Sequence, residues 1–558
     1  MVFALDTTAQ KQFINDTVMA RRYIEERGEV YFSFEASISE VRRLSNVIWI
    51  DKYAEGSVYA YAGKEGFSAF LEESIAFTVY SPPGEWYKER PGLKNGNWDY
   101  YPAYSAYVEM MQSWSVDYSH LCEYVDAGTT SGGRKILFLK ISGSNSTFIP
   151  KPRFMYSSTM HGDETVGFIM MLRLIEYLLE NYPHNPQVKH LMDNLEIWIN
   201  PLANPDGCYF GGDPDKIDSP KRTNFNNTDL NRDFPVIHDS NYHIDGREPE
   251  TVAMMEVIEK YNFTMSANIH GGAEVINYPW DSKAERHADD RWFEYISREY
   301  ADTAQHYSPP AYMTYLGGVT NGHDWYSITG GRQDYVTFFT GGREITMEIS
   351  DVKHPPVNTL ADYWEYNRRS LLNYMEQAIF GVRGRIRDAV TGEAVRAKVK
   401  ILSYDTDSSH IYSDSLSGWY FRLLEQGIYN LLFSATGYYN DTVSVQVWNR
   451  DTSRIDVSMV PLTAGSPSTG EPDEEIFHVF YSAAEEVLDV KIYLPESVYA
   501  TIVMYDISGR EIRLLHEGWT EPRYSSFTFT TTDINNGLYI IALNFRRSYV
   551  SRKIFISE

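Results

Sequence analysis

The stretch MHGDETVG, residues 160–167, places one histidine, two acids and two glycines immediately before a long apolar run. Downstream, apolar residues recur at the spacing of one helix face: Phe168, Met171, Leu172, Ile175 and Leu179. Upstream, a short, half-apolar run over 154–157 is typical of a strand. The stretch therefore predicts a turn that opens a helix. Its acids, Asp163 and Glu164, have two interpretations: favourable charges at the positive end of the helix dipole or, with His161, part of a metal site.

The composition is that of a folded, acidic protein with several domains. A chain of 558 residues predicts about three or four domains. Hydrophobic residues make up 43% of the chain and aromatic residues 15%, which is enough to form the cores of these domains. Fifty Lys and Arg residues against 76 acids give a net charge of -26. This balance argues against general binding to nucleic acid or anionic membranes and suits cationic ligands. Solubility explains the acidity equally well, so composition leaves both readings open.

The cysteine content and the apolar runs give information on the cellular compartment of the protein. Cys122 and Cys208 allow one disulfide but no disulfide framework. The chain has no run of about 18 apolar residues, so we expect no transmembrane helix. The start, MVFALDTTAQ, has no basic segment and is not a complete secretory signal. The sequence therefore predicts either a cytoplasmic protein or one whose signal is missing from this chain.

Two different patterns fill the first two thirds of the chain. Residues 1–82 are predicted to be an α+β domain: after a polar lead-in, 29–82 follow the order strand, helix, strand, strand, helix, strand of a ferredoxin-like unit. Residues 83–98 are rich in Pro, Gly and Asn and predict a linker. From 99 to 380, strand-like and helix-like runs alternate. That alternation predicts a mixed α/β sheet covered by helices.

The remainder of the chain has an all-β pattern. Short strands separated by turns over 381–462 predict a compact β sandwich. Residues 463–475, TAGSPSTGEPDEE, have the composition of a flexible linker. Residues 476–558 predict a second small β sandwich. The fold class is thus multidomain, with one α/β domain flanked by an α+β unit and two β sandwiches.

Three residues are candidates for a metal site. A zinc hydrolase needs about three protein ligands and an open position for water. His161 and Glu164 supply two, and His270, at the end of the apolar strand FTMSANIHGG, is the candidate third. A histidine at a strand end is also a common structural residue. Glu348 lies within the apolar strand EITMEIS, where an unpaired acid is costly to bury, and Glu344 on the same strand face competes with it.

A polar stretch supplies a candidate anion site. KRTNFNNTDLNRDFP contains Arg222, Asn231 and Arg232. Two arginines with an amide suit a carboxylate, because the guanidinium group donates two parallel hydrogen bonds to it.

Six motifs together resemble one family. HGDE, NPLANPDG, TDLNRDFP, SANIHGGAEVINYPWD, GVTNGHDWYSITGGRQDY and ITMEIS are similar, in this order, to the motifs of the zinc carboxypeptidases. Within that family they resemble the branch containing carboxypeptidases N, E, M and D. The resemblance runs from about 99 to 380 and continues into the transthyretin-like β domain that this branch carries next.

The resemblance implies a catalytic role for five residues. One zinc ion per catalytic domain would be held by His161, Glu164 and His270. Glu348 matches the general base and proton shuttle, and Arg222 matches the arginine that polarises the scissile carbonyl. The expected activity is hydrolysis of the C-terminal peptide bond.

The resemblance also implies how substrate is bound. Asn231 and Arg232 match the pair that holds the terminal carboxylate, and Tyr326 matches the tyrosine that closes over the substrate. Asp281 stands where the branch places the acid that accepts a Lys or Arg side chain, and Gln333 occupies the floor of the same pocket. The expected partners are therefore peptide and protein C-termini, with basic ones preferred.

Two rivals to this function remain. One is the same fold with another C-terminal or cell-wall peptide specificity, and the other is a non-catalytic peptide-binding homologue. Tyr335 stands where the family usually has Trp, which leaves the packing of the pocket open.

The flanking units resemble other domains more weakly. Residues 29–82 have the topology of the propeptides of the carboxypeptidase A and B group. The last domain, with VMYDISGREI and NNGLYIIAL, is similar to the sorting domain that Bacteroidetes attach to type IX secretion cargo. An ordinary accessory β sandwich is the alternative. The resemblance implies a secreted or cell-surface protein that meets secretion machinery through this domain.

Overall fold

The computed structural model describes most of the chain. Its described residues are 7–54, 56–86, 98–143, 150–237, 244, 246–462, 477–482, 486–492, 494, 497–506, 510–522, 524–545 and 548–556. Among the helices in these ranges, none is both long and apolar enough to cross a membrane.

The N-terminal unit is a four-stranded antiparallel sheet in the order β2-β3-β1-β4, with two helices packed on it. Its elements are β1 Val30–Glu35, α2 Ile38–Leu44, β2 Trp49–Ala54, β3 Ser57–Ala62, α3 Lys64–Glu72 and β4 Phe77–Tyr80. The segment before it, predicted as a polar lead-in, is instead helix α1, Thr7–Arg27, which packs against β1 and β4. Of the predicted linker 83–98, residues 83–85 form the short helix η1 and Trp98 is buried, whereas 87–97 lie outside the described residues.

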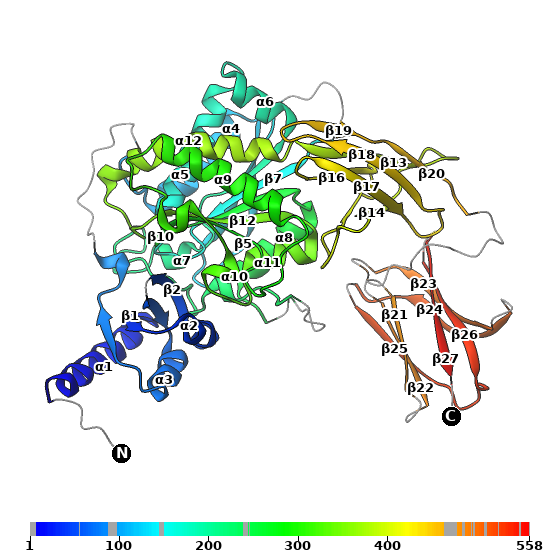
Figure 1. The fold of residues 1–558 in the computed structure, drawn as a ribbon, viewed down its shortest axis with the longest axis horizontal. Coiled ribbons are helices and arrows are strands. Elements are labelled where there is room, and N and C mark those ends of the chain that lie inside the picture. Colours follow the sequence, from blue (N-terminus) through cyan, green and yellow to red (C-terminus); the bar gives the residue numbers. More distant parts are fainter. Residues whose placement is uncertain are drawn as a thin grey trace.

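An eight-stranded mixed sheet lies at the centre of the molecule, in the order β11-β10-β12-β9-β7-β8-β6-β5 (Figure 1). Strands β12, β9, β7 and β8 are parallel to one another, whereas β10 pairs antiparallel with β12 and β6 with β8. The strands are β5 Cys122–Thr129, β6 Lys135–Ile141, β7 Arg153–Ser158, β8 Glu196–Asn200, β9 Met265–His270, β10 Ala273–Tyr278, β11 Val319–Asn321 and β12 Arg343–Ser350. The predicted mixed sheet is confirmed.

Helices cover both faces of this sheet. Along β7, Phe154 and Tyr156 join one core and Met155 the other, as the alternation of side chains in a strand requires. The first core packs under α4 Tyr104–Asp117, α5 Val166–Asn181, α6 Pro186–Asn194, α9 Asp290–His306 and α12 Leu360–Gln377. The second packs under α8 Pro249–Tyr261. Shorter turns are α7 Pro205–Cys208, η2 Leu230–Arg232, η3 Tyr315–Gly318, α10 Gly322–Trp325, α11 Arg332–Tyr335, η4 Val336–Thr340 and η5 Val357–Thr359. Cys122 and Cys208 are buried and do not form the disulfide that the sequence allowed.

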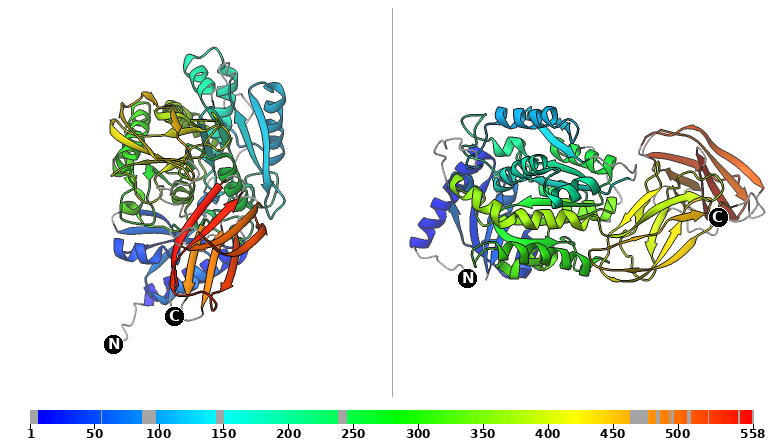
Figure 2. Two further views of the ribbon diagram at one scale, coloured as in Figure 1. Left: turned by 90° about the vertical axis from the view of Figure 1, so that its right-hand side faces the viewer. Right: turned by 90° about the horizontal axis from the view of Figure 1, so that it is seen from above.

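The C-terminal part holds four β sheets, paired around two hydrophobic cores. The first pair is β16-β13-β19, with β20 also on β13, and β15-β14-β17-β18; the second is β21-β22-β25 and β24-β23-β26-β27. The strands of the first pair are β13 Gly381–Asp388, β14 Lys398–Ile401, β15 Ile411–Tyr412, β16 Trp419–Arg422, β17 Gly427–Ser434, β18 Asp441–Val447, β19 Thr452–Arg454 and β20 Val457–Met459. Those of the second are β21 Phe477–Ser482, β22 Val487–Ile492, β23 Tyr499–Asp506, β24 Glu511–Trp519, β25 Ser525–Thr530, β26 Gly537–Phe545 and β27 Ser548–Ile556. The N-terminal unit and these sheets lie at opposite ends of the molecule (Figure 2, right).

A buried ionic cluster joins the central α/β part to the first β sandwich. Arg422 donates two hydrogen bonds to Asp289, at 2.7 and 2.9 Å, and a third to Asp405 at 2.7 Å. Arg343 on β12 donates to the same Asp289 at 2.7 Å. Since these side chains are buried, each charge depends on its partners. Buried ion pairs therefore join the two parts, in addition to the covalent chain.

Candidate metal centre and substrate pocket

The metal candidates in the quoted stretch lie in the tight turn between β7 and α5. Gly162 in this turn passes so close to the next loop that a Cβ atom would lie 2.3 Å from the carbonyl carbon of Gly207. Only glycine fits there, and the close approach fixes the neighbouring His161 and Glu164. Helix α5 begins at Val166. Glu164 therefore lies before the helix, with its carboxylate directed at two histidine rings rather than at the helix end.

Three buried side chains meet with their donor atoms facing one another. Glu164 Oε1 lies 2.9 Å from His161 Nδ1, and Glu164 Oε2 lies 2.8 Å from His270 Nδ1. All three donor atoms lie within 4.8 Å of one another, and the side chains are almost completely buried. Two imidazoles and one carboxylate are the donor set that zinc takes in hydrolases with an open fourth position. The residues present therefore fit a zinc ion.

The far nitrogen of each histidine is also held. His161 Nε2 lies 3.0 Å from Asp229 Oδ1, and His270 Nε2 lies 2.6 Å from the amide of Asn268. Partners of this kind fix the tautomer and ring orientation of a metal-binding histidine.

The charges around Glu164 favour its ionised form. Burial alone would raise its pKa, but the nearby His161, Lys353 and His270 outweigh burial and hold the pKa of Glu164 well below its ordinary value. The ammonium group of Lys353 lies 2.6 Å from Glu164 Oε1. The carboxylate of Glu164 is thus held in the ionised form in which it can bind a metal ion.

The structure separates the two competing glutamates of β12. Glu348 lies opposite His270 in the register of β12 and β9, and its Oε2 is buried with no hydrogen-bond partner among the described residues. Burial first, and then the charge of Glu164, raises the pKa of Glu348 well above its ordinary value. Glu344 instead accepts two hydrogen bonds from Arg332, at 2.9 and 3.1 Å, and one from Ser266. Glu348 is therefore the acid that reaches the pocket, and Glu344 belongs to a buried ion pair.

The arginine and amide candidates line the same pocket. Arg222 is held by Asp229, with two nitrogen to oxygen distances of 3.0 Å, and its NH1 lies 3.5 Å from Glu164 Oε1. Arg232 follows Asn231 in η2 and has a buried Nε with no hydrogen-bond partner among the described residues. An unpaired buried guanidinium nitrogen fits a site that awaits an anion.

The opposite end of the pocket holds Asp281. Its Oδ1 accepts hydrogen bonds from Gln333 at 2.9 Å and from Asn277 at 3.2 Å. Burial, and next the charge of Asp334, raises the pKa of Asp281 well above its ordinary value. Gly322 passes so close that a Cβ atom would lie 1.8 Å from Asp281 Oδ1. Asp281 is thus fixed in place and forms no ion pair with a cationic side chain among the described residues.

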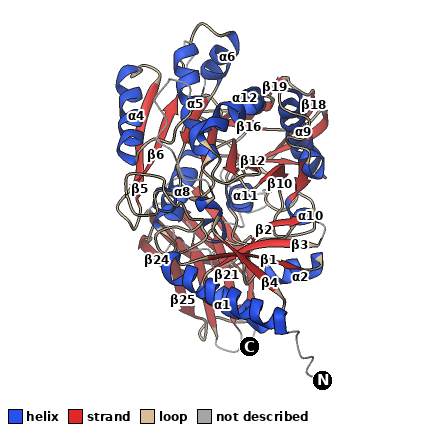
Figure 3. Ribbon diagram, turned by 90° about the vertical axis from the view of Figure 1, so that its left-hand side faces the viewer, coloured by secondary structure: helices blue, strands red, loops and turns tan. Residues whose placement is uncertain are grey.

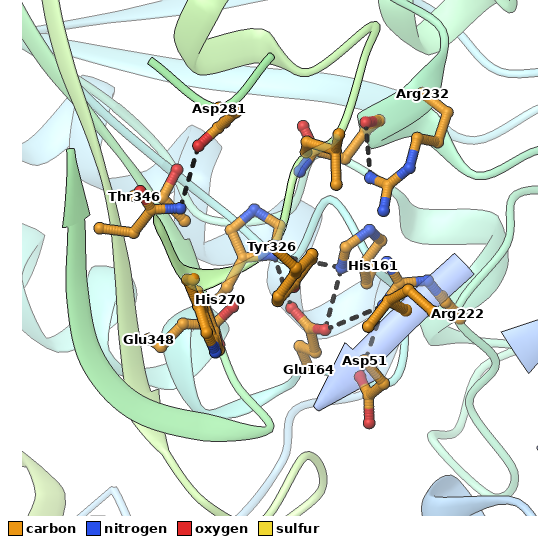
Figure 4. Close-up of a pocket in the computed structure, with 15 residues that line it drawn as sticks. Asp51, His161, Glu164, Arg222, Arg232, His270, Asp281, Tyr326, Thr346 and Glu348 are labelled. Atoms are coloured by element: carbon orange, nitrogen blue, oxygen red, sulfur yellow. Dashed lines mark hydrogen bonds and ion pairs between the residues drawn. The ribbon is translucent and has the colours of Figure 1, made fainter. Parts of the chain in front are cut away.

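One cavity unites these residues (Figure 4). Nine of the ten residues predicted from the sequence line it: His161, Glu164, Arg222, Asn231, Arg232, His270, Asp281, Tyr326 and Glu348. Gln333 is not among the lining residues, but it donates a hydrogen bond to Asp281. Tyr335 is completely buried against Phe234, with its hydroxyl 3.0 Å from Glu259, so it packs under the site and is not among the pocket-lining residues.

Sequence reasoning missed several residues of the site. Asp229 and Asn277 lie within quoted motifs, two residues before Asn231 and four residues before Asp281, so their place in the motif could have indicated them. Lys353 lies three residues after the end of β12 and gave no local signal. Asp51 comes from the N-terminal unit, far away along the chain, and nothing in its own stretch indicated this position.

The sheet and the His161, Glu164 and His270 cluster have the form of a zinc hydrolase, and the chain is similar in sequence to known zinc carboxypeptidases. The zinc carboxypeptidase family, Peptidase M14, matches residues 107–370. The chain is 34% identical to human carboxypeptidase D over 362 residues, which are 62% of this chain but only 26%, about a quarter, of that protein. It is 32% identical to mouse carboxypeptidase M over 344 residues, 59% of this chain and 76% of that protein. It is 30% identical to Caenorhabditis elegans carboxypeptidase E over 394 residues, 62% of this chain and 83% of that protein. The chain belongs to the zinc carboxypeptidase family.

Proposed function

We propose that this chain is a zinc-dependent metallocarboxypeptidase that removes C-terminal Lys or Arg from peptides and proteins. The observation that carries the proposal is the arrangement of the pocket. A buried donor set for one metal ion lies beside Glu348, and the same cavity holds Arg232 for an anion and Asp281 for a cation. A C-terminal basic residue carries both charges.

The chemistry divides among a few side chains. A bound zinc ion would supply Lewis acidity toward the scissile carbonyl and lower the pKa of the attacking water. Glu348 accepts the proton of that water on its unpaired Oε2 and delivers it to the leaving amine. Arg222, fixed by Asp229, stabilises the negative charge that develops on the carbonyl oxygen.

Exopeptidase action follows from the anion site. Asn231 and Arg232 hold the substrate's terminal carboxylate, so an internal peptide bond leaves the buried Nε of Arg232 without a partner. Asp281 adds the preference for Lys or Arg, because an apolar side chain leaves its charge without a partner.

The experiment that tests this function compares Glu348→Gln with the wild type on peptides ending in Arg. We expect kcat to fall by several powers of ten while zinc content and peptide affinity persist, because the substitution removes only the proton acceptor. Glu365→Gln, on an exposed position of α12, is the matched control. Equal rates for Glu348→Gln and the wild type would rule out this chemistry.

We also propose that the two C-terminal β units serve placement rather than chemistry. The strands over 381–459 fit a transthyretin-like accessory domain. The motifs VMYDISGREI and NNGLYIIAL in the last β unit resemble a sorting domain of type IX secretion, which would place the protein outside the cell or on its surface. Deletion of residues 476–558 should leave peptidase activity intact and stop export in the native host. Unchanged export of the shortened protein would refute the sorting role.

A further inference from the structure

The acid at the selective end of the pocket lies near the start of a loop of turns and bends. Residues 279–289 join the end of β10 to the start of α9, and these two elements pack against each other (Figure 3). Asp281 is the third residue of this loop and is buried, whereas residues 284–286 are exposed. The position of the Asp281 carboxylate therefore depends on the contacts that hold the loop.

One anchor of the loop lies within the catalytic part. Asp334 of α11 accepts hydrogen bonds from the backbone amides of Asp281 and Ser282, at 2.9 and 3.0 Å. The same carboxylate accepts a hydrogen bond from the hydroxyl group of Ser282 at 2.5 Å. Asp334 thus fixes the backbone at the acid itself.

Two further anchors come from the first β sandwich, residues 381–459, which lies directly beside the central part (Figure 1). The ammonium group of Lys283, two residues after the pocket acid, donates to Asp407 at 2.5 Å and lies 5.0 Å from the centre of the Trp280 ring. At the far end of the loop, Asp289 accepts hydrogen bonds from Arg422 of β16 at 2.7 and 2.9 Å. Side chains of the sandwich therefore hold the loop on both sides of its exposed part.

The segment that carries Asp407 is itself held in a rare backbone conformation. Asp407 and Ser408 have φ angles of 46° and 59°, in the left-handed region that residues other than glycine seldom adopt. Asp405 accepts hydrogen bonds from Ser409 at 3.0 Å and from Arg422 at 2.7 Å, so both anchors belong to one network. Such conformations persist where the surrounding contacts over-determine them, and they cluster at functional sites.

The ion pair of Lys283 and Asp407 is partly shielded from solvent. The two side chains are 16% and 30% exposed, so salt and water screen this pair less than a pair on the open surface. The loss of either charge should therefore loosen the loop close to the pocket acid.

We infer that Lys283, Asp407 and Arg422 are positioning residues, through which the first β sandwich sets substrate selectivity by holding the loop of the pocket acid. This inference rests on the proposed peptidase function. None of the three is among the described residues that line the pocket, so they act on the substrate only through Asp281. The metal candidates lie on other elements, the turn before α5 and the end of β9, so a looser loop leaves them in place.

The test removes the charge of Lys283 in the full-length protein. Lys283→Met loses the ion pair, Lys283→Arg keeps it, and both are assayed on two peptides that differ only in a C-terminal Arg or Leu. Residues that touch no ligand typically change a coupling between sites by an amount that corresponds to roughly two- to thirtyfold. We expect the ratio of kcat/KM for Arg over Leu to fall by that factor in Lys283→Met, through the Arg peptide alone, and to be restored in Lys283→Arg. Lys189→Met, which breaks an exposed ion pair with Asp193 on α6, is the matched control and should leave the ratio unchanged.

Asp407→Asn breaks the same ion pair from the side of the sandwich. Asparagine removes the charge but tolerates the left-handed conformation as aspartate does, so the substitution adds little strain. The ratio should fall as in Lys283→Met, and the double variant should fall little further, because both changes act through one contact. Equal losses on the Arg and Leu peptides, with a lower midpoint of thermal unfolding, would show that the ion pair only stabilises the fold and that the inference is wrong.

Hydrogen exchange separates this inference from the proposed chemistry. The backbone amides of residues 279–289 should exchange faster in Lys283→Met and in Asp407→Asn than in the wild type, and at the wild-type rate in Lys189→Met. If no protein cleaves either peptide but this exchange rises, the sandwich holds the loop as inferred and the proposed peptidase function fails. If the exchange is unchanged in both variants, or if it rises while the Arg to Leu ratio keeps its wild-type value, the inference is wrong.

Discussion

Asp281→Asn tests how the pocket selects its substrate. The substitution keeps the shape of the side chain and an oxygen that can accept from Asn277 and Gln333, so it removes the charge and little else. Asp281 is buried, and its pKa is raised by burial and by Asp334. Loss of a buried charge partner costs about 2 to 5 kcal/mol, which corresponds to roughly thirty-fold to several-thousand-fold in kcat/KM for a peptide ending in Arg.

The assay compares two peptides that differ only in a C-terminal Arg or Leu. The rate on Leu should hold or rise in Asp281→Asn, since its side chain no longer faces an unpaired acid. The wild-type preference for Arg should fall as the pH is lowered, because a raised pKa means that Asp281 takes up a proton earlier than an ordinary acid. Asp324→Asn, on an exposed carboxylate, is the control. Equal losses on the Arg and Leu peptides would refute the reasoning.

Two further predictions concern zinc affinity and stability. Asp229→Asn should lower the affinity for zinc by roughly 10- to 100-fold, since Asp229 orients His161, and competition with a chelator measures this. Asp289→Asn should lower the free energy of unfolding by about 3 to 5 kcal/mol in urea titrations, because Arg343 and Arg422 lose a buried partner. Burial opposes ionisation of Asp289, but the two arginines hold its pKa below the ordinary value, so this stabilisation is complete above about pH 4 and is lost as the pH falls further. If Asp289→Asn lowered the free energy of unfolding by the same amount at pH 2 as above pH 4, that assignment would be contradicted.

The sequence predicted the central part of the molecule well because its signals are local. Strand ends, a glycine turn and a helix start fix where His161, Glu164 and His270 lie, and parallel neighbouring strands then bring them together. The choice between Glu344 and Glu348 could not be made locally, since both lie on one strand face. The deciding partner is Arg332, which comes from α11.

The features that the sequence missed depend on contacts between distant segments. Helix α1 was overlooked because its composition is polar and its packing against β1 and β4 leaves little apolar pattern. The contact of Asp51 with Lys353 joins residues 302 positions apart in the sequence (353 - 51). Such a pairing requires the relative placement of two units, which no motif in either unit encodes.

Titration of zinc into the metal-free protein tests the central claim most directly. A peptide ending in Arg is incubated with the full-length protein while mass spectrometry follows the products. The account predicts no product without metal, loss of the single C-terminal residue once zinc is added, and a rate that saturates at one zinc ion per chain. Full turnover without metal, or cleavage at an internal bond, would contradict it.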